Sequence, residues 1–381
     1  VAQAVGAGDR PAVARALQRG LVLAGMLSLP TALLLLTAAP VLRGFGQPLD
    51  VVPLAAAYAV RMIPGVPSFF AFVVCRQTLQ AMARLRPIVV VIVLANLTNV
   101  ALNWVMIYGH LGLPTMGVIG SAWSTTISRV LMGFAIVGLA WPELGPSLLP
   151  VRPGVFAWPP LRRMLGIGVP IGLQYQLEYG VFATVALLMG RLGTVPVAAH
   201  QVAINLASLT FMVPLGVSAA ATVLVGHAVG RADAREASRA ARAALATGVA
   251  FMCATALLML ALPEPLARAY SRDPAVIALA ASLLPIAGAF QIFDGIQVVS
   301  IGILRGLADT RGPFVIGLLG FWLLGFPVSL WLGFGVHRGP AGLWWGLVVG
   351  LAAVAMLLLA RVRARLRRGV RRVLVDAPEA A

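Results

Sequence analysis

Residues 275–304 read AVIALAASLLPIAGAFQIFDGIQVVSIGIL and contain a single charged side chain, that of Asp294. About 20 apolar residues in a helix cross the hydrocarbon core of a bilayer, which is roughly 30 Å thick. The stretch is longer than this, so it is predicted to form a transmembrane helix. That helix carries one acidic side chain at membrane depth.

Similar apolar runs recur along the whole chain. Charged residues make up 11 % of the 381 residues, whereas a soluble domain carries about 25 %. Ten runs are long enough to span a bilayer, and they cover residues 21–42, 51–75, 87–108, 118–140, 164–190, 197–226, 243–262, 275–304, 313–334 and 341–360. We therefore predict an all-α membrane protein, a polytopic bundle of ten transmembrane helices.

All 29 basic residues are arginine, and the net charge of the chain is +17. Such a charge would suit a nucleic-acid-binding protein, but these arginines lie mainly in short loops between the apolar runs. When the loops are assigned alternately to the two sides of a membrane, 22 arginines fall on one side and six on the other. Because arginine-rich loops stay in the cytoplasm, both chain ends are predicted to be cytoplasmic. No nucleic-acid partner is expected.

The chain repeats itself at a distance of about 224 residues. Three pairs of segments align in register, namely 1–9 with 225–233, 79–86 with 304–311 and 117–123 with 339–345. Apolar helices can resemble one another by chance, but chance would not also align glycine, aspartate and arginine residues in the loops. We therefore interpret the similarity as a true internal repeat. An even number of helices separates equivalent points, so the two halves are expected to be parallel repeats with a substrate cavity at their interface.

The repeat also predicts the domain organisation. Residues 1–150 are expected to form an N-terminal lobe of four helices, 151–362 a C-terminal lobe of six, and 363–381 an arginine-rich cytoplasmic tail. In the second half two helices precede the segment 225–233, whereas the equivalent segment of the first half begins at residue 1. We therefore expect the intact protein to have two further N-terminal helices, roughly 65 residues, and six plus six helices in all.

Several of these segments resemble one family. They are the loop motifs 6–9 and 230–233, the stretch 294–298 followed by 304–309, the stretch 199–203, and the stretch 99–104. In this order they are similar to the multidrug and toxic compound extrusion (MATE) transporters, in particular the bacterial type coupled to Na⁺ or H⁺. The resemblance implies a multi-pass protein of the bacterial cytoplasmic membrane that exports drugs and is not an enzyme.

Two of the twelve acidic residues, Glu178 and Asp294, lie deep within apolar runs. A carboxylate at membrane depth costs several kcal/mol unless it is paired, protonated or hydrated, so it marks a functional site by default. The alternative is a structural role, in which each acid hydrogen-bonds a neighbouring helix. The resemblance implies that Glu178 and Asp294 form a cation site, and that they bind Na⁺ if the protein is Na⁺-coupled.

The resemblance further implies exchange by alternating access. Na⁺ or a proton would enter from outside and compete with a cationic, amphipathic drug for the charge of Glu178 and Asp294. No cofactor is expected, because the exchange needs neither a covalent intermediate nor a nucleotide. The chain also contains no lysine and hence no phosphate-binding loop. The expected partners are cationic drugs and membrane lipid, and the protein is expected to be a monomer.

Further polar residues are candidates for ion or substrate contacts. Asn99 and Asn103 share a helix face, and the resemblance implies that they frame a second ion site, although polar contacts between helices are an alternative. The other candidates for lining a cavity are Gln174, Tyr175, Gln201, Asn205 and Gln291. Arg305 ends an apolar run and is expected to anchor the cytoplasmic end of its helix.

Two other classes of function remain open. A flippase for lipid-linked sugars, from the same broader superfamily, should have a long cavity lined by arginine to hold a pyrophosphate. In this sequence only one arginine, Arg129, is assigned to neither side of the membrane and lies within a helix, and the acids are placed at membrane depth. A channel assembles from identical subunits around an axis, whereas an internal repeat with two acids in one half favours alternating access.

Overall fold

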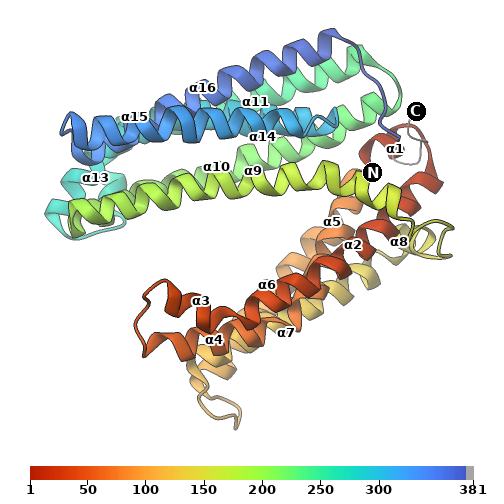
Figure 1. Ribbon diagram of the computed structural model, residues 1–381, viewed down its shortest axis with the longest axis horizontal. Coiled ribbons are helices and arrows are strands. Elements are labelled where there is room, and N and C mark those ends of the chain that lie inside the picture. The colour runs from red at the N-terminus through yellow and green to blue at the C-terminus, as the bar shows by residue number, and fades with distance from the viewer. Residues whose placement is uncertain (375–381) are drawn as a thin grey trace. The chain divides into compact units, whose positions relative to one another are not determined.

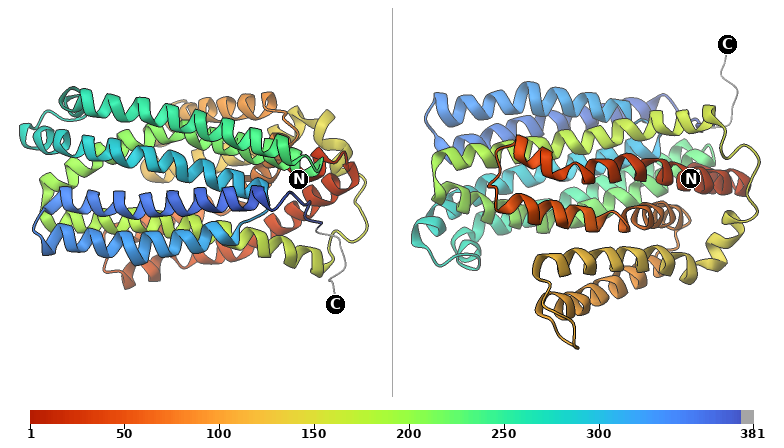
Figure 2. Two further views of the ribbon diagram at one scale, coloured as in Figure 1. Left: turned by 90° about the horizontal axis from the view of Figure 1, so that it is seen from above. Right: turned by 60° about the horizontal axis from the view of Figure 1, so that its bottom comes forward.

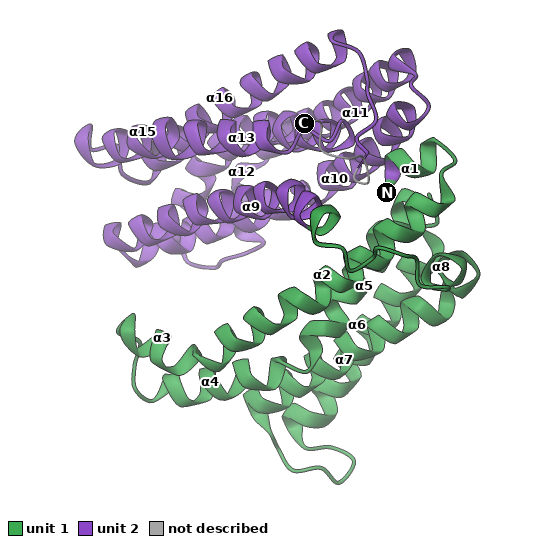
Figure 3. Cartoon of the chain, turned by 45° about the vertical axis from the view of Figure 1, so that its right-hand side comes forward, with its two compact units in different colours: residues 1, 3–161 green, residues 2, 162–381 purple. Residues whose placement is uncertain are grey.

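The computed structural model describes residues 1–374, and α-helices joined by short loops make up nearly all of them, with no β-strand in that part of the chain (Figures 1 and 2). The chain divides into two compact units (Figure 3). Unit 1 comprises residue 1 and residues 3–161, and unit 2 comprises residue 2 and the chain from residue 162 onward.

Unit 1 is a helical bundle around a small apolar core. Its helices are α1 (Ala2–Gly6), α2 (Arg10–Leu36), α3 (Ala38–Gly44), α4 (Val51–Met62), α5 (Gly65–Ala81), α6 (Arg86–Tyr108), α7 (Gly117–Leu139) and α8 (Trp141–Leu148). Leu17 of α2, Phe72 and Leu79 of α5, and Ile136 of α7 meet in this core and are almost completely buried. Helices α4 and α5 meet at Pro64 with a bend of 52°, since proline lacks the N–H that continues a helix.

Unit 2 contains the longer helices. They are α9 (Trp158–Leu192), α10 (Thr194–Gly230), α11 (Ala234–Ala261), α12 (Pro263–Arg268), α13 (Pro274–Gly306), α14 (Arg311–Gly317), α15 (Phe326–Leu330) and α16 (Gly339–Arg367). Two π-helical segments, η1 (Leu318–Gly325) and η2 (Trp331–Gly335), continue α14 and α15 into one long rod. Such i→i+5 turns are rare and widen a helix locally.

Helices α13 and α16 form the centre of unit 2. About half of the most apolar part of each helix is buried, 50 % in α13 and 56 % in α16, against 17–28 % in the other spans. Close packing depends on glycine. A Cβ atom at Gly346 would overlap the backbone of Ser329, and one at Gly302 would overlap Ser218. The helices therefore approach one another more closely than larger side chains would allow.

The local geometry confirms the internal repeat. Asp9 caps α2 by accepting a hydrogen bond from the Ala12 amide at 3.0 Å, and Asp233 caps α11 in the same way from Glu236 at 2.8 Å. Side chains of Asp at the N-cap satisfy an amide that the helix leaves free. The aligned pairs Ala83 with Ala308, and Gly117 with Gly339, have matching positive φ angles of 57° with 58° and 52° with 56°.

Each of the ten predicted runs lies in a helix or in a series of adjoining helical segments. Eight helical spans within the described residues are long and apolar enough to cross a membrane, and the bent pair α4–α5 brings this number to nine. The predicted run 164–190 lies in α9, which is not among the nine. Its polar segment 174–178, Gln-Tyr-Gln-Leu-Glu, lowers its hydropathy. The all-helical membrane fold is confirmed.

The predicted lobe boundary at residue 150 lies in the loop between α8 and α9, and the compact units separate slightly later, after Leu161. The first residues of the predicted tail are helical, because α16 continues to Arg367. Residues 375–381 of the predicted tail lie outside the described residues. The expected number of helices in each lobe of the intact protein stays a prediction.

Candidate functional site

Unit 2 contains a cavity of about 360 Å³ that both Glu178 and Asp294 line. Its walls come from α9, α10 and α13, each of which contributes residues spaced three or four apart. Such spacing places them on one face of each helix. The lining residues on α13, for example, are Phe290, Asp294, Val298, Ile301 and Arg305. Three helix faces thus converge on one chamber.

Glu178 lies on α9 and Asp294 on α13, so the fold brings together two acids that are more than 100 residues apart in sequence. Asp294 is 7 % exposed and Glu178 is half-buried. Gln297 is buried beside them, and its amide lies where it can donate to the Glu178 carboxylate. Two carboxylates in one cavity repel each other unless a proton or a cation lies between them.

Arg305 is a third charged residue in this cavity. Its guanidinium donates a hydrogen bond of 2.8 Å to the hydroxyl of Tyr175 and lies 4.8 Å from the centre of the Tyr175 ring. An arginine therefore lies in the same cavity as the two acids, and the expected role of Arg305 as an anchor at the end of its helix stays a prediction. The physical reason is helical geometry: eleven residues make about three turns, so Arg305 shares a face with Asp294. This spacing could have been read from the sequence.

Aromatic side chains form much of the remaining wall. Phe182 and Phe290 both line the cavity and pack edge to face, with ring centres 5.8 Å apart. Phe290 packs in the same way against Trp344, at 5.9 Å. Tyr179 and Phe211 complete the aromatic lining. Aromatic faces attract organic cations, each contact contributing about 0.5–2 kcal/mol, so the chamber combines apolar walls with negative charge.

The other predicted residues of unit 2 occupy different environments. Gln174 and Tyr175 line the cavity beside Glu178. Gln291 does not line it, since it is fully buried and its amide nitrogen donates to the Thr210 hydroxyl. Gln201 and Asn205 are exposed on α10 and do not line this cavity either.

Asn99 and Asn103 lie on α6 in unit 1. The Asn103 amide donates a hydrogen bond of 3.0 Å to the side-chain oxygen of Asn99, and its own buried oxygen accepts none. The two residues thus form a pair on one helix face, as their spacing predicted. Their proposed part in a second ion site stays a prediction.

Asp294 has no acidic counterpart at the aligned position in the first half of the repeat. The register that pairs Leu79 with Leu304 places Phe69 at the position of Asp294. Phe69 contacts the guanidinium of Arg129, 4.9 Å from its ring centre. In the described residues, no group of three acidic, histidine or cysteine side chains could hold a metal ion. Glu178 and Asp294, which line one cavity, are the candidate ion site.

Comparison with known proteins identifies the family. The sequence model of the MatE family matches residues 1–105 and 170–331. The multidrug resistance protein MdtK of Cronobacter sakazakii is 34 % identical over 375 residues, which cover 95 % of this chain and 81 % of that protein.

Solved structures of low sequence identity share the fold. The eukaryotic MATE transporter AtDTX14 superposes with a TM-score of 0.84 at 22 % identity, over 96 % of this chain and 83 % of that one. A transporter of the MOP superfamily from Pyrococcus furiosus superposes with a TM-score of 0.81 at 20 % identity, over 96 % and 81 % of the two chains. On the evidence of the family match and the identity to MdtK, this chain belongs to the MATE family of multi-pass multidrug efflux transporters.

Proposed function

We propose that this protein exports cationic, amphipathic compounds in exchange for Na⁺ or H⁺, and that Glu178 and Asp294 bind the coupling ion. The observation that carries the proposal is the placement of both acids in one aromatic-walled cavity of unit 2. The carboxylates provide the charge that an ion or a proton neutralises, and the aromatic rings suit an organic cation. The sequence similarity of this chain to MdtK, a multidrug resistance protein, supports the same function.

The charges of the cavity suggest how exchange is coupled. Glu178 and Asp294, when ionised, and Arg305 together carry a net charge of −1. One proton or one Na⁺ neutralises the site, and so does one monovalent drug. A ligand can drive a conformational change only through its different affinity for the two states. Competition for one uncompensated negative charge therefore couples drug release to ion entry.

We further propose a location and an orientation. The excess of arginine on one side of the predicted topology supports a cytoplasmic position for both ends of the chain. Membership of a family that includes a protein of the bacterium Cronobacter sakazakii supports the bacterial cytoplasmic membrane. The proposed transporter works as a monomer, needs no cofactor and binds no nucleic acid.

The test is dye uptake into everted membrane vesicles under an imposed Na⁺ or pH gradient. The wild type is expected to accumulate a cationic dye, and the gradient that drives uptake identifies the ion. Glu178→Gln and Asp294→Asn are expected to abolish gradient-driven uptake, because each removes one of the two charges that bind the ion. Each substitution keeps the size of the side chain, so packing should change little.

Glu264→Gln is the matched control, since Glu264 forms only an exposed ion pair with Arg268. It should transport as well as the wild type. Uptake by both cavity variants at the wild-type rate would show that the acids are structural and would overturn the proposed mechanism.

A flippase of lipid-linked sugars is the alternative within the broader superfamily. It would require arginines in place of the acids in the cavity of Glu178 and Asp294, whereas that cavity holds two acids and one arginine. A competition arm separates the two functions: a cationic dye should be displaced by other organic cations and not by a pyrophosphate-linked lipid. The reverse result would favour the flippase.

A further inference from the structure

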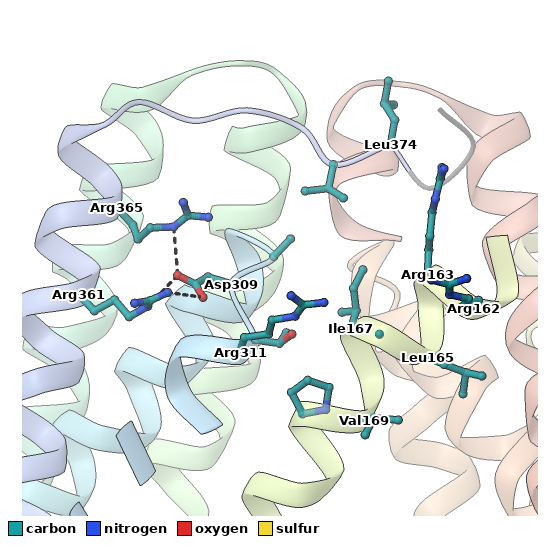
Figure 4. Close-up of a pocket in the computed structure, with 15 residues that line it drawn as sticks. Arg162, Arg163, Leu165, Ile167, Val169, Asp309, Arg311, Arg361, Arg365 and Leu374 are labelled. Carbon is teal, nitrogen blue, oxygen red and sulfur yellow. Dashed lines mark hydrogen bonds and ion pairs between the residues drawn. The ribbon is translucent and has the colours of Figure 1, made fainter. Parts of the chain in front are cut away.

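A second cavity of unit 2 is rich in arginine. It has a volume of about 860 Å³ and lies where α9 and α14 begin and α16 ends (Figure 4). Its charged lining consists of Arg162, Arg163, Arg311, Arg361, Arg365 and Asp309. Five arginines and one aspartate give this lining a formal charge of +4. We call it the arginine pocket, and it shares no lining residue with the cavity of Glu178 and Asp294.

Asp309 organises the pocket but does not neutralise it. Its buried carboxylate accepts two hydrogen bonds from Arg361, at 2.9 and 3.1 Å, and it pairs with the Nε atom of Arg365 at 3.1 Å (Figure 4). Both of its oxygens are thus occupied. The ion pair of Arg365 uses only Nε, so its two terminal nitrogens remain available to another acceptor.

Two further arginines of the pocket lack any acidic partner. Within residues 1–374, neither Arg162 nor Arg311 forms an ion pair or a side-chain hydrogen bond. Like charges gathered around one cavity repel each other, and a multivalent anion removes that repulsion. The planar guanidinium group matches the oxygens of a phosphate in pairs. The charge and the geometry therefore favour a phosphate-bearing ligand.

The apolar part of the lining indicates where that phosphate comes from. Leu165, Ile167 and Val169 follow the arginines along α9 and line the same pocket. An adjoining cavity of about 390 Å³ shares Arg361 and Arg365, and its other lining residues include Ile316 and Leu357. Arginine beside an apolar wall suits a phospholipid, whose charged headgroup adjoins its acyl chains. Basic pockets between helices at the cytoplasmic surface bind anionic headgroups in this way.

We propose that the arginine pocket binds the phosphate group of an anionic phospholipid from the cytoplasmic leaflet. Arg162 and Arg311 supply free guanidinium groups, and Asp309 holds Arg361 and Arg365 in position. The site is independent of the proposed ion exchange. A bound headgroup would join α9 to α14 and α16 at one end of unit 2.

The test is binding of short-chain phosphatidylglycerol to the detergent-solubilised full-length protein, measured by native mass spectrometry and by thermal stabilisation. Short-chain phosphatidylcholine and inorganic phosphate are the comparison ligands. The wild type is expected to bind phosphatidylglycerol at least tenfold more tightly than phosphatidylcholine. The double variant Arg162→Gln/Arg311→Gln is expected to lose at least tenfold in affinity, because it removes two charged donors and no ion pair.

The control variant is Arg235→Gln/Arg239→Gln, which removes the same charge from α11 outside the pocket. It should bind the lipid as the wild type does. Equal losses in both double variants, or none in Arg162→Gln/Arg311→Gln, would overturn the proposal.

The comparison ligands separate the possible sources of the phosphate. Binding of inorganic phosphate as tight as that of phosphatidylglycerol would overturn the lipid source and assign the pocket to a free anion. The end of the chain carries two acidic residues, Asp376 and Glu379, which could occupy the pocket in place of a lipid. Comparing the whole chain with a chain shortened to Leu374 tests this alternative. If phosphatidylglycerol binds only to this shortened chain, the end of the chain occupies the pocket and the proposal fails.

Discussion

The guanidinium of Arg305 donates a hydrogen bond of 2.8 Å to the hydroxyl of Tyr175 and stacks on its ring, inside the cavity that Glu178 and Asp294 line. Tyr175 precedes Glu178 by about one helical turn on α9, and Arg305 follows Asp294 by about three turns on α13. This contact therefore holds a permanent positive charge in the chamber of the two acids.

Replacing Arg305 by glutamine should increase the apparent affinity for the coupling ion by roughly tenfold, equivalent to about 1.4 kcal/mol. The reason is that the two carboxylates lose their internal counter-charge and attract an external cation more strongly. The measurement is the ion concentration that gives half-maximal dye transport. Arg305→Lys keeps the charge and should stay near the wild type. An unchanged affinity in Arg305→Gln would show that this arginine does not act on the acids.

The aromatic wall should determine drug affinity without affecting ion binding. Tyr179→Ala and Phe211→Ala each remove a ring from the cavity, and one cation–π contact contributes about 0.5–2 kcal/mol. The KM for a cationic aromatic dye should therefore rise by about two- to thirtyfold, since 1.4 kcal/mol is a factor of ten. Leu215→Ala, which removes an aliphatic lining residue, should have a smaller effect. Equal effects of all three substitutions would argue against cation–π recognition.

Asp309 should contribute to stability more than an exposed acid does. Asp309→Asn weakens charged hydrogen bonds to Arg361 and Arg365 and should lower the free energy of unfolding by about 2 kcal/mol. Glu264→Gln disrupts an ion pair whose side chains are 56 % and 67 % exposed, and such pairs contribute little. Thermal unfolding in detergent compares the two variants. Similar unfolding midpoints for the two variants would mean that the buried Asp309 contributes no more to stability than the exposed Glu264 does.

Glycine at the contact between α15 and α16 should be indispensable. Gly346→Ala places a Cβ where the backbone of Ser329 already lies, and overpacking of this kind costs about 2 kcal/mol or more. Gly216→Ala is the matched control on α10, because no atom lies within 4 Å of the added Cβ. We expect lower thermal stability only for Gly346→Ala. An unfolding midpoint equal to that of the wild type would show that α15 and α16 can move apart to accommodate the methyl group without loss of stability.

Much of the fold could be predicted from the sequence because a bilayer imposes strong local rules. Apolar runs of sufficient length must be helical at membrane depth, since no water is present to bond the backbone. The repeat could be recognised because its loops need particular residues, such as Asp9 and Asp233 at helix N-caps. Glu178 and Asp294 could be selected as a pair because acids at membrane depth are costly and rare.

Other features depended on how the helices pack. Apolar composition alone did not indicate that α13 and α16 form the centre of unit 2, or that Gln291 points into the protein interior while Gln201 remains exposed. Hydropathy measures the preference of a segment for lipid over water. It does not predict which face of a helix packs against a neighbouring helix. In a membrane, both faces can be apolar.

The sequence by itself therefore determined the helical spans, the internal repeat, the family and the two membrane-embedded acids, because each of these depends on local composition or on residue order. Only the tertiary structure decided that Arg305 shares a cavity with those acids and that five arginines surround Asp309 in a second pocket. These contacts join residues from different helices, and their distances follow from the angle and rotation at which those helices pack.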